Sequence, residues 1–152
     1  LVAEQCVDEA VRSARLAAGR SASHALDIAR ADGEVAGRFS AYGAEQRDLE
    51  KLIAGHPELD EPLHPDLPYC GAHFVWAAKA EMALTVYDAL AYRTRAMFIN
   101  ARAGSAIARR VAELMATELG HDRSWIESQT NAVRTQAIPF TSTPTRAHET
   151  HG

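Results

Sequence analysis

Three histidines, an aspartate and a cysteine gather in one short stretch and carry side chains that can bind a metal ion. They are His56, His64, Asp66, Cys70 and His73. Cys70 and His73 stand at a spacing that zinc tolerates, but zinc sites usually carry a second tight pair, which His64 and Asp66 would have to supply from a proline-rich loop. We therefore expect surface histidines, a buried inert thiol and no metal. The alternative is a small metal-binding protein that uses His64, Cys70 and His73.

Arginines form a second group that could bind a ligand, because an arginine fork holds a phosphate or a carboxylate through two hydrogen bonds. The group is Arg93, Arg95, Arg102, Arg109 and Arg110. Arg109 and Arg110 fall on the polar face of a predicted amphipathic helix, where charge is expected. One hypothesis is a free-standing helical binding module in which Arg93, Arg95 and Arg102 recognise a phosphorylated or nucleic-acid partner.

A structural role for Arg93 and Arg95 is the hypothesis that we favour. They stand at a predicted helix end, where arginine side chains bind the last carbonyl groups. Glu81 and Asp88 precede them and offer carboxylates for pairing. Their spacing of two residues places them on different sides of a helix, so we expect no shared ligand.

Composition and missing motifs exclude several classes of protein. The net charge is −4 and the isoelectric point is about 6.0, which argues against a nucleic-acid partner. The chain has no glycine-rich dinucleotide loop, no Walker loop and no G-x-S-x-G motif. No apolar run approaches the ~20 residues of a membrane-spanning helix. Two cysteines cannot form a disulfide framework, so a reducing cytosol is favoured.

The elements that must position these residues are all predicted to be helices. Alanine is abundant, and β-branched and aromatic residues are sparse, which favours helix over strand. We expect an all-α fold, an orthogonal bundle of five to six helices with no β-sheet. Apolar periodicity and end signals predict helices over 1–18, 33–42, 44–54, 71–84, a short helix from 85, then 105–119 and 122–138.

Several helix ends carry specific signals. Thr85 and Asp88 have the form of a capping box, and Asp122 can cap the last helix. Gly43 and Gly120 are predicted C-terminal stops, and the last helix should end before Pro139. Residues 55–70 hold four of the six prolines and are predicted to contain no regular structure.

The predicted core follows the apolar faces of these helices, with the helix over 105–119 at its centre. Its members are Phe39, Leu49, Ile53, Phe74, Ala78, Met82, Val111, Leu114, Met115 and Leu119. Residues 1–18 should instead expose Val2, Val7 and Val11, because an apolar face without a partner marks a lost interface.

One long motif in the chain reads Glu81-Met82-Ala83-x-Thr85-x-x-Asp88-x-Leu90-x-x-Arg93-Thr94-Arg95. It resembles a known family, the C-terminal helical domain of FAD-dependent glycerol-3-phosphate dehydrogenases. The likeness continues through the segment Val111-Ala112-x-Leu114-Met115-Ala116-x-Glu118-Leu119-Gly120. This chain departs from the family at Tyr92, where an arginine is usual, and at His121, where many members have tryptophan.

The resemblance implies a parent enzyme that oxidises glycerol 3-phosphate to dihydroxyacetone phosphate and passes electrons through FAD to a membrane quinone. In the family, the FAD-binding and catalytic residues lie in a large N-terminal region. The resemblance therefore implies that this chain has no catalytic, cofactor-binding or metal site and is inactive alone. Its partner would be the FAD-binding domain of the same parent chain. The signature residues with a structural or interdomain role would be Glu81, Thr85, Asp88, Arg93, Thr94 and Arg95.

The same resemblance divides the chain into four parts. Residues 1–18 would be the trailing helix of a missing FAD-binding domain, and residues 19–31 a linker. Residues 32–138 would form the C-terminal helical domain, and residues 139–152 a disordered tail. The expected location is cytoplasmic, with the parent enzyme peripheral on the inner membrane.

Overall fold

The computed structural model describes residues 2–19, 21–22 and 37–141, and these residues form an all-α fold as predicted. The one β feature among them is an isolated bridge between Pro62 and Cys70. The elements in chain order are α1 (Val2–Ser13), η2 (Ser40–Glu45), α2 (Gln46–Gly55), η3 (Pro57–Asp60), α3 (Gly71–Lys79), η4 (Asp88–Arg93), α4 (Ala96–Ile99), α5 (Ala101–Leu119) and α6 (Arg123–Thr141). Elements η2 and η3 are 3-10 helices and η4 is a π-helix. Most of the predicted linker, residues 33–36 of the predicted helix over 33–42 and the tail from 142 lie outside the described residues.

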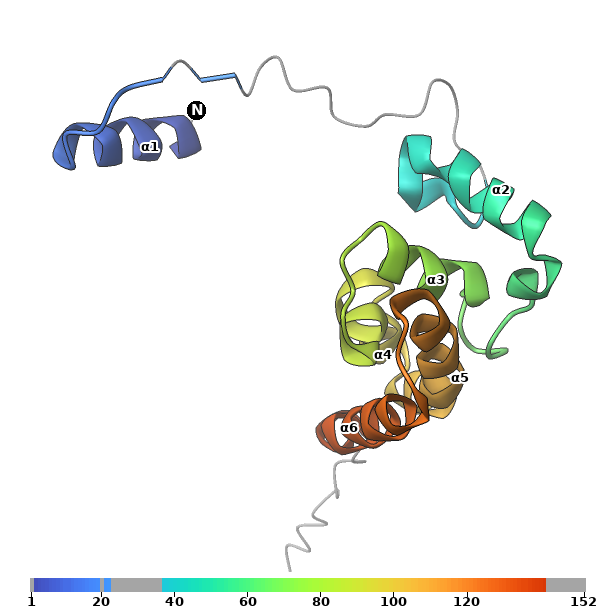
Figure 1. The fold of residues 1–152 in the computed structure, drawn as a ribbon. Coiled ribbons are helices and arrows are strands. Elements are labelled where there is room, and N and C mark those ends of the chain that lie inside the picture. Colours follow the sequence, from blue (N-terminus) through green and yellow to red (C-terminus); the bar gives the residue numbers. More distant parts are fainter. Residues whose placement is uncertain (1, 20, 23–36, 142–152) are drawn as a thin grey trace, which may run out of the picture.

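Helix α5 is central, as its apolar stripe predicts, and α3, α4 and α6 pack against it (Figure 1). Ile107, Val111 and Met115 on α5 are buried. Asn100 caps the helix by accepting a hydrogen bond from the Ala103 amide at 3.1 Å, and Gly120 ends it with a left-handed φ of 72°. The helix begins four residues before the predicted Ser105, because Asn100 supplies an earlier cap.

Two apolar clusters make up the core of the described part. The larger joins α3, η4, α4, α5 and α6 around Phe74 and Leu90. The smaller joins η2, α2, η3 and α3 around Leu49, and Leu114 of α5 packs against it. Of the predicted core residues, Phe39, Leu49, Phe74, Ala78, Val111 and Met115 are buried, and Ile53, Leu114 and Leu119 are half-buried.

Met82 is the predicted core residue that the structure contradicts, since 80% of it is exposed. The predicted helix over 71–84 ends at Lys79. Beyond it the Ala83 amide donates to the Ala77 carbonyl at 2.9 Å, a contact that closes a turn and interrupts the helical period. The periodicity that placed Met82 on an inward face therefore stops before it reaches that residue.

Other predicted boundaries also move. Helix α1 ends at Ser13, and α6 runs through Pro139 to Thr141. A proline so near the end removes few helical hydrogen bonds, while buried Val133 and Ala137 hold α6 against the core. Gly43 does break the helical conformation, with φ 56°, but it lies inside η2 at a kink. The proline-rich stretch contains the short helix η3, contrary to the prediction of no regular structure.

Helix α1 lies apart from the bundle in Figure 1, and none of its residues is buried. Val2 and Val7 are exposed, as predicted, and Val11 is half-buried. Among the described residues, no helix combines the length and the apolar character needed to cross a membrane.

Candidate functional site

The signature segment begins in the turn that follows α3. The Ala80 amide closes α3 by donating to the Trp76 carbonyl at 2.8 Å. Met82 then adopts a left-handed backbone conformation with φ 58°, which residues other than glycine seldom adopt. The chain therefore reverses direction with Glu81 half-buried and Met82 turned to solvent.

Thr85 and Asp88 form the predicted capping box at the next turn. The Asp88 amide donates to Thr85 Oγ1 at 3.1 Å, and the Thr85 amide donates to Asp88 Oδ2 at 2.9 Å. The Leu84 amide donates to the same carboxylate oxygen at 3.3 Å. The Val86 amide donates to Gln129 Oε1 of α6 at 3.0 Å, so a helix distant in sequence completes this set of hydrogen bonds. These hydrogen bonds satisfy amides that a helix start leaves without partners.

The helix that follows is the π-helix η4, and Thr94 is its C-cap residue. The Thr94 amide donates to the Ala89 carbonyl, five residues earlier, at 3.0 Å, and its hydroxyl donates to the same oxygen at 2.8 Å. The Tyr69 hydroxyl donates to the Thr94 carbonyl from the proline-rich stretch. Thr94 is buried, so its hydroxyl serves the backbone and is closed to solvent.

Arg93 binds the backbone of the preceding turn. Its Nε donates to the Glu81 carbonyl at 2.8 Å. Glu81 is one of the predicted partners, but its carbonyl rather than its carboxylate accepts this bond, and the Asp88 carboxylate caps amides instead. Arg95 has a left-handed φ of 60° and begins α4. The assignment of the six signature residues to an interface stays a prediction.

The remaining arginines of the group lie on α5 and are exposed. Arg109 and Arg110 pair with Glu113 at 3.2 and 3.6 Å, on the polar face that the sequence predicts. Arg102 is exposed near the start of the helix.

Glu81 is the most perturbed carboxylate of the segment. Burial raises the pKa of its carboxyl group, the Arg93 guanidinium opposes that rise, and the Glu45 carboxylate adds to it. Its Oε2 is buried and has no hydrogen-bond partner among the described residues. Burial also raises the pKa of Tyr42, with a further contribution from Glu81.

His73 and Cys70 serve the start of α3. The Cys70 amide donates to His73 Nδ1 at 3.1 Å, and the Cys70 sulfur lies 3.4 Å from the same nitrogen. The rings of Phe39, Tyr42 and Tyr69 surround the imidazole, with centroid distances of 4.8, 5.8 and 5.2 Å. This burial lowers the pKa of His73 to about 4. The prediction of a surface histidine is therefore wrong for His73, whereas Cys70 is buried as predicted.

The other metal candidates pair locally. His56 lies 3.4 Å from Glu58, and His64 lies 3.9 Å from Asp66. The Asp66 amide also donates to His64 Nδ1 at 3.1 Å. Within the described part of the chain, no three histidine, cysteine or carboxylate side chains come together as a metal site.

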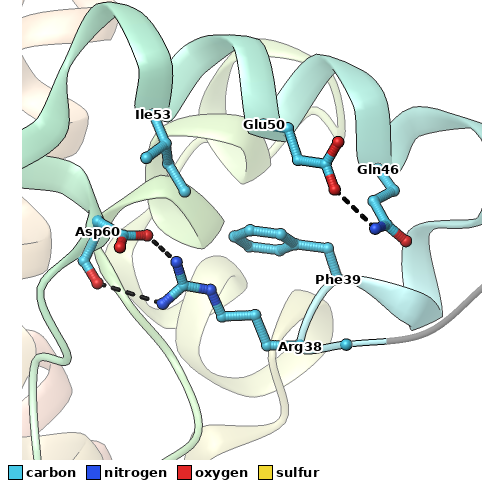
Figure 2. Close-up of a pocket in the computed structure, with 7 residues that line it drawn as sticks. Arg38, Phe39, Gln46, Glu50, Ile53 and Asp60 are labelled. Carbon is cyan, nitrogen blue, oxygen red and sulfur yellow. Dashed lines mark hydrogen bonds and ion pairs between the residues drawn. The ribbon is translucent and has the colours of Figure 1, made fainter.

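One cavity of about 320 Å³ opens between residues 37–39, α2 and η3 (Figure 2). Arg38 forms an ion pair with Asp60 across it, and its guanidinium lies 4.9 Å from the centre of the Phe39 ring. Gln46 donates to Glu50 at 2.7 Å on the opposite wall. Because the two side chains of each pair bond to each other, the cavity presents no converging set of unpaired charges to a ligand.

Sequence reasoning missed three side chains that hold this region. Tyr69 bonds to Thr94, Gln129 bonds to the Val86 amide, and Trp76 Nε1 donates to Glu45 Oε2 at 3.0 Å. All three bonds join residues far apart in sequence.

The geometry defines an all-helical domain whose most elaborate site is a turn held by side-chain to backbone hydrogen bonds. The family model described as the C-terminal domain of alpha-glycerophosphate oxidase matches residues 7–125. This chain therefore belongs to that family of helical domains. The match includes the whole signature segment.

A curated relative agrees with this family. A glycerol-3-phosphate dehydrogenase from Synechocystis sp. is 44% identical over 71 residues, which are 46% of this chain and 13% of the relative. The chain thus spans a small part of the relative that it matches. No solved structure matches the chain at a significant level.

Proposed function

We propose that this chain is the C-terminal helical domain of an FAD-dependent enzyme that oxidises glycerol 3-phosphate to dihydroxyacetone phosphate and passes electrons to a membrane quinone. The observation that carries the proposal is the family match over residues 7–125. The Synechocystis relative, named a glycerol-3-phosphate dehydrogenase, supports the same substrate. In the proposal the enzyme is cytoplasmic and peripheral on the inner membrane.

The described residues do not fit FAD. Dinucleotide sites place the pyrophosphate between a glycine-rich turn that follows a strand and the N-terminus of the next helix. The described part of this chain has no strand, and the cavity between residues 37–39, α2 and η3 is bridged by the Arg38–Asp60 ion pair. FAD and substrate therefore bind elsewhere in the parent enzyme, and the role proposed for this domain is to pack on the domain that holds them.

A comparison of two proteins tests the proposal. The parent enzyme should show a flavin absorption spectrum that glycerol 3-phosphate bleaches, and it should reduce a quinone analogue. The 152-residue chain alone should bind no flavin and show no turnover. Flavin binding or turnover by the 152-residue chain would overturn the division of roles. A parent enzyme whose flavin absorption is not bleached by glycerol 3-phosphate would overturn the proposed activity.

A further inference from the structure

Three large apolar side chains of the signature segment are exposed. They are Met82, Leu84 and Tyr92, exposed by 80%, 65% and 61%. We call this set the signature patch. Exposed apolar groups that gather on one surface mark interaction sites more often than scattered ones do.

Hydrogen bonds within the turn bring the patch together. The Arg93 Nε to Glu81 carbonyl bond of 2.8 Å joins the turn after α3 to the end of η4. Met82 and Tyr92 are the chain neighbours of the two bonded residues, so their backbones lie close together. The ring of Tyr92 also packs edge-on against Tyr87, with 5.8 Å between centroids, which fixes its orientation.

The polar members of the segment have their bonding groups engaged inside the turn. The side chains of Thr85 and Asp88 bond to each other's amides, and the buried Thr94 hydroxyl bonds to the Ala89 carbonyl. These groups keep the turn in a fixed shape, and what the turn presents outward is apolar. The left-handed Met82 is a strained backbone conformation that turns an apolar side chain to solvent, and such strain is typical of functional surfaces.

We infer that the signature patch is the docking surface for the flavin-binding part of the same parent enzyme. The inference rests on the proposed function and adds the face that makes the contact. The matched region is 13% of the Synechocystis relative and the family is a C-terminal domain, so a much larger body accompanies such a domain. Arg93 and Arg95 are exposed beside the patch, and interface cores favour this mixture of arginine, tyrosine and methionine.

The three methionines of the chain provide a test with internal controls. Met82 is exposed, whereas Met97 and Met115 are buried at 2% and 0%. Methionine oxidation by dilute hydrogen peroxide follows exposure and is read site by site by mass spectrometry. In the 152-residue chain, Met82 should oxidise at least about tenfold faster than the other two. In the parent enzyme, that advantage should disappear because the flavin domain covers Met82.

Two variants of the parent enzyme sharpen the test. Leu84→Gln should restore rapid oxidation of Met82, because it weakens the docking next to that side chain. Ile138→Gln changes an equally exposed side chain on α6 and should leave the Met82 rate unchanged. Rapid Met82 oxidation in the unmodified parent enzyme would overturn the inference, and so would equal effects of the two variants.

Other occupants of the patch give different results. Protection of Met82 in the 152-residue chain at high protein concentration would indicate a second copy of the chain. Protection by vesicles of equal parts phosphatidylethanolamine and phosphatidylglycerol would indicate a membrane surface. Either result, without protection in the detergent-solubilised parent, overturns the inference. The flavin reduction assay separates the two proposals: a parent enzyme that responds to glycerol 3-phosphate while Met82 stays reactive refutes the docking surface alone.

Discussion

A neutral imidazole is what the surroundings of His73 accommodate. The Cys70 amide donates to its Nδ1 at 3.1 Å, and three aromatic rings enclose the ring. Protonation would replace the accepted hydrogen bond with a second N–H and leave a charge among apolar groups. The pKa of about 4 expresses that cost.

The first prediction is that His73 makes the fold sensitive to acid. The unfolded chain takes up a proton on this histidine near its ordinary pKa of 6.5, whereas the folded chain does so only near pH 4. Its contribution to stability is therefore present above pH 6.5 and is lost as the pH falls toward 4, to a total of about 3 kcal/mol. Chemical unfolding at pH 7.0 and pH 4.5 measures this loss.

His73→Gln keeps a neutral acceptor for the Cys70 amide and removes the titration. The variant should lose less stability between the two pH values than the unmodified chain does. His56→Gln, at an exposed position, serves as control and should follow the unmodified chain. Equal losses in all three proteins would show that His73 does not set the acid sensitivity.

The second prediction concerns Arg93, whose Nε holds the Glu81 carbonyl. Arg93→Lys replaces a planar fork with a point charge that cannot copy this geometry. Since the side chain is exposed, we expect a loss of stability of about 1 kcal/mol or less and an unchanged Michaelis constant for glycerol 3-phosphate in the parent enzyme. Thermal melting and steady-state kinetics on one preparation measure both. A raised Michaelis constant at unchanged melting temperature would make Arg93 a ligand-binding residue.

At the scale of the element, α5 holds the bundle together by two faces. Met115 is fully buried in the larger cluster, while the half-buried Leu114 packs against the smaller one. The adjacent residues therefore tie both clusters to one helix. The polar face carries Arg109 and Arg110 paired to Glu113. These ion pairs contribute little to the stability of the fold because they are open to water.

The third prediction follows from these two faces. Met115→Ala should lower the free energy of unfolding by about 2–5 kcal/mol, because it leaves a cavity in a closed core. Leu114→Ala should cost less than Met115→Ala, since part of Leu114 already faces solvent. Arg110→Ala is the matched surface control, with a change within about 0.5 kcal/mol. Urea unfolding of the three variants ranks them, and a larger loss for Leu114→Ala than for Met115→Ala would contradict the assignment of faces.

At the scale of the whole molecule, α1 contributes no buried residue to the core. Its Val2 and Val7 are exposed, and its Arg12 pairs with Glu9 on the same helix. The apolar face of α1 therefore contributes no residue to either of the two apolar clusters. An origin as the trailing helix of a preceding domain fits this arrangement and stays a prediction.

The fourth prediction is that deletion of residues 1–18 leaves the melting temperature of the remaining chain nearly unchanged. The physical reason is that α1 contributes no fully buried residue, so its removal costs little buried apolar area. Differential scanning calorimetry of the two proteins measures the difference. A fall of several degrees would mean that α1 belongs to the core of this domain.

Local patterns in the sequence determined the elements that depend on near neighbours. The stripe of α5, the Thr85–Asp88 capping box, the Asp122 cap and the Gly120 end all involve residues within one or two helical turns. Such residues meet whenever the helix forms, whatever surrounds it. The all-α fold and the family signature were predictable for the same reason, because both depend on patterns among residues close together in the sequence.

Tertiary structure alone decided the shape of the signature turn and the surroundings of its residues. The Tyr69 hydroxyl and Gln129 reach this segment from other parts of the chain, and the Ala83 amide closes a turn that ends the helical period before Met82. The same holds for His73, which is buried because Phe39, Tyr42 and Tyr69 converge on it. The bonds from Tyr69 to Thr94 and from Val86 to Gln129, and the packing of Phe39 and Tyr42 on His73, join segments distant in sequence. No local period encodes such contacts, and they determine whether a given side chain faces the core or the solvent.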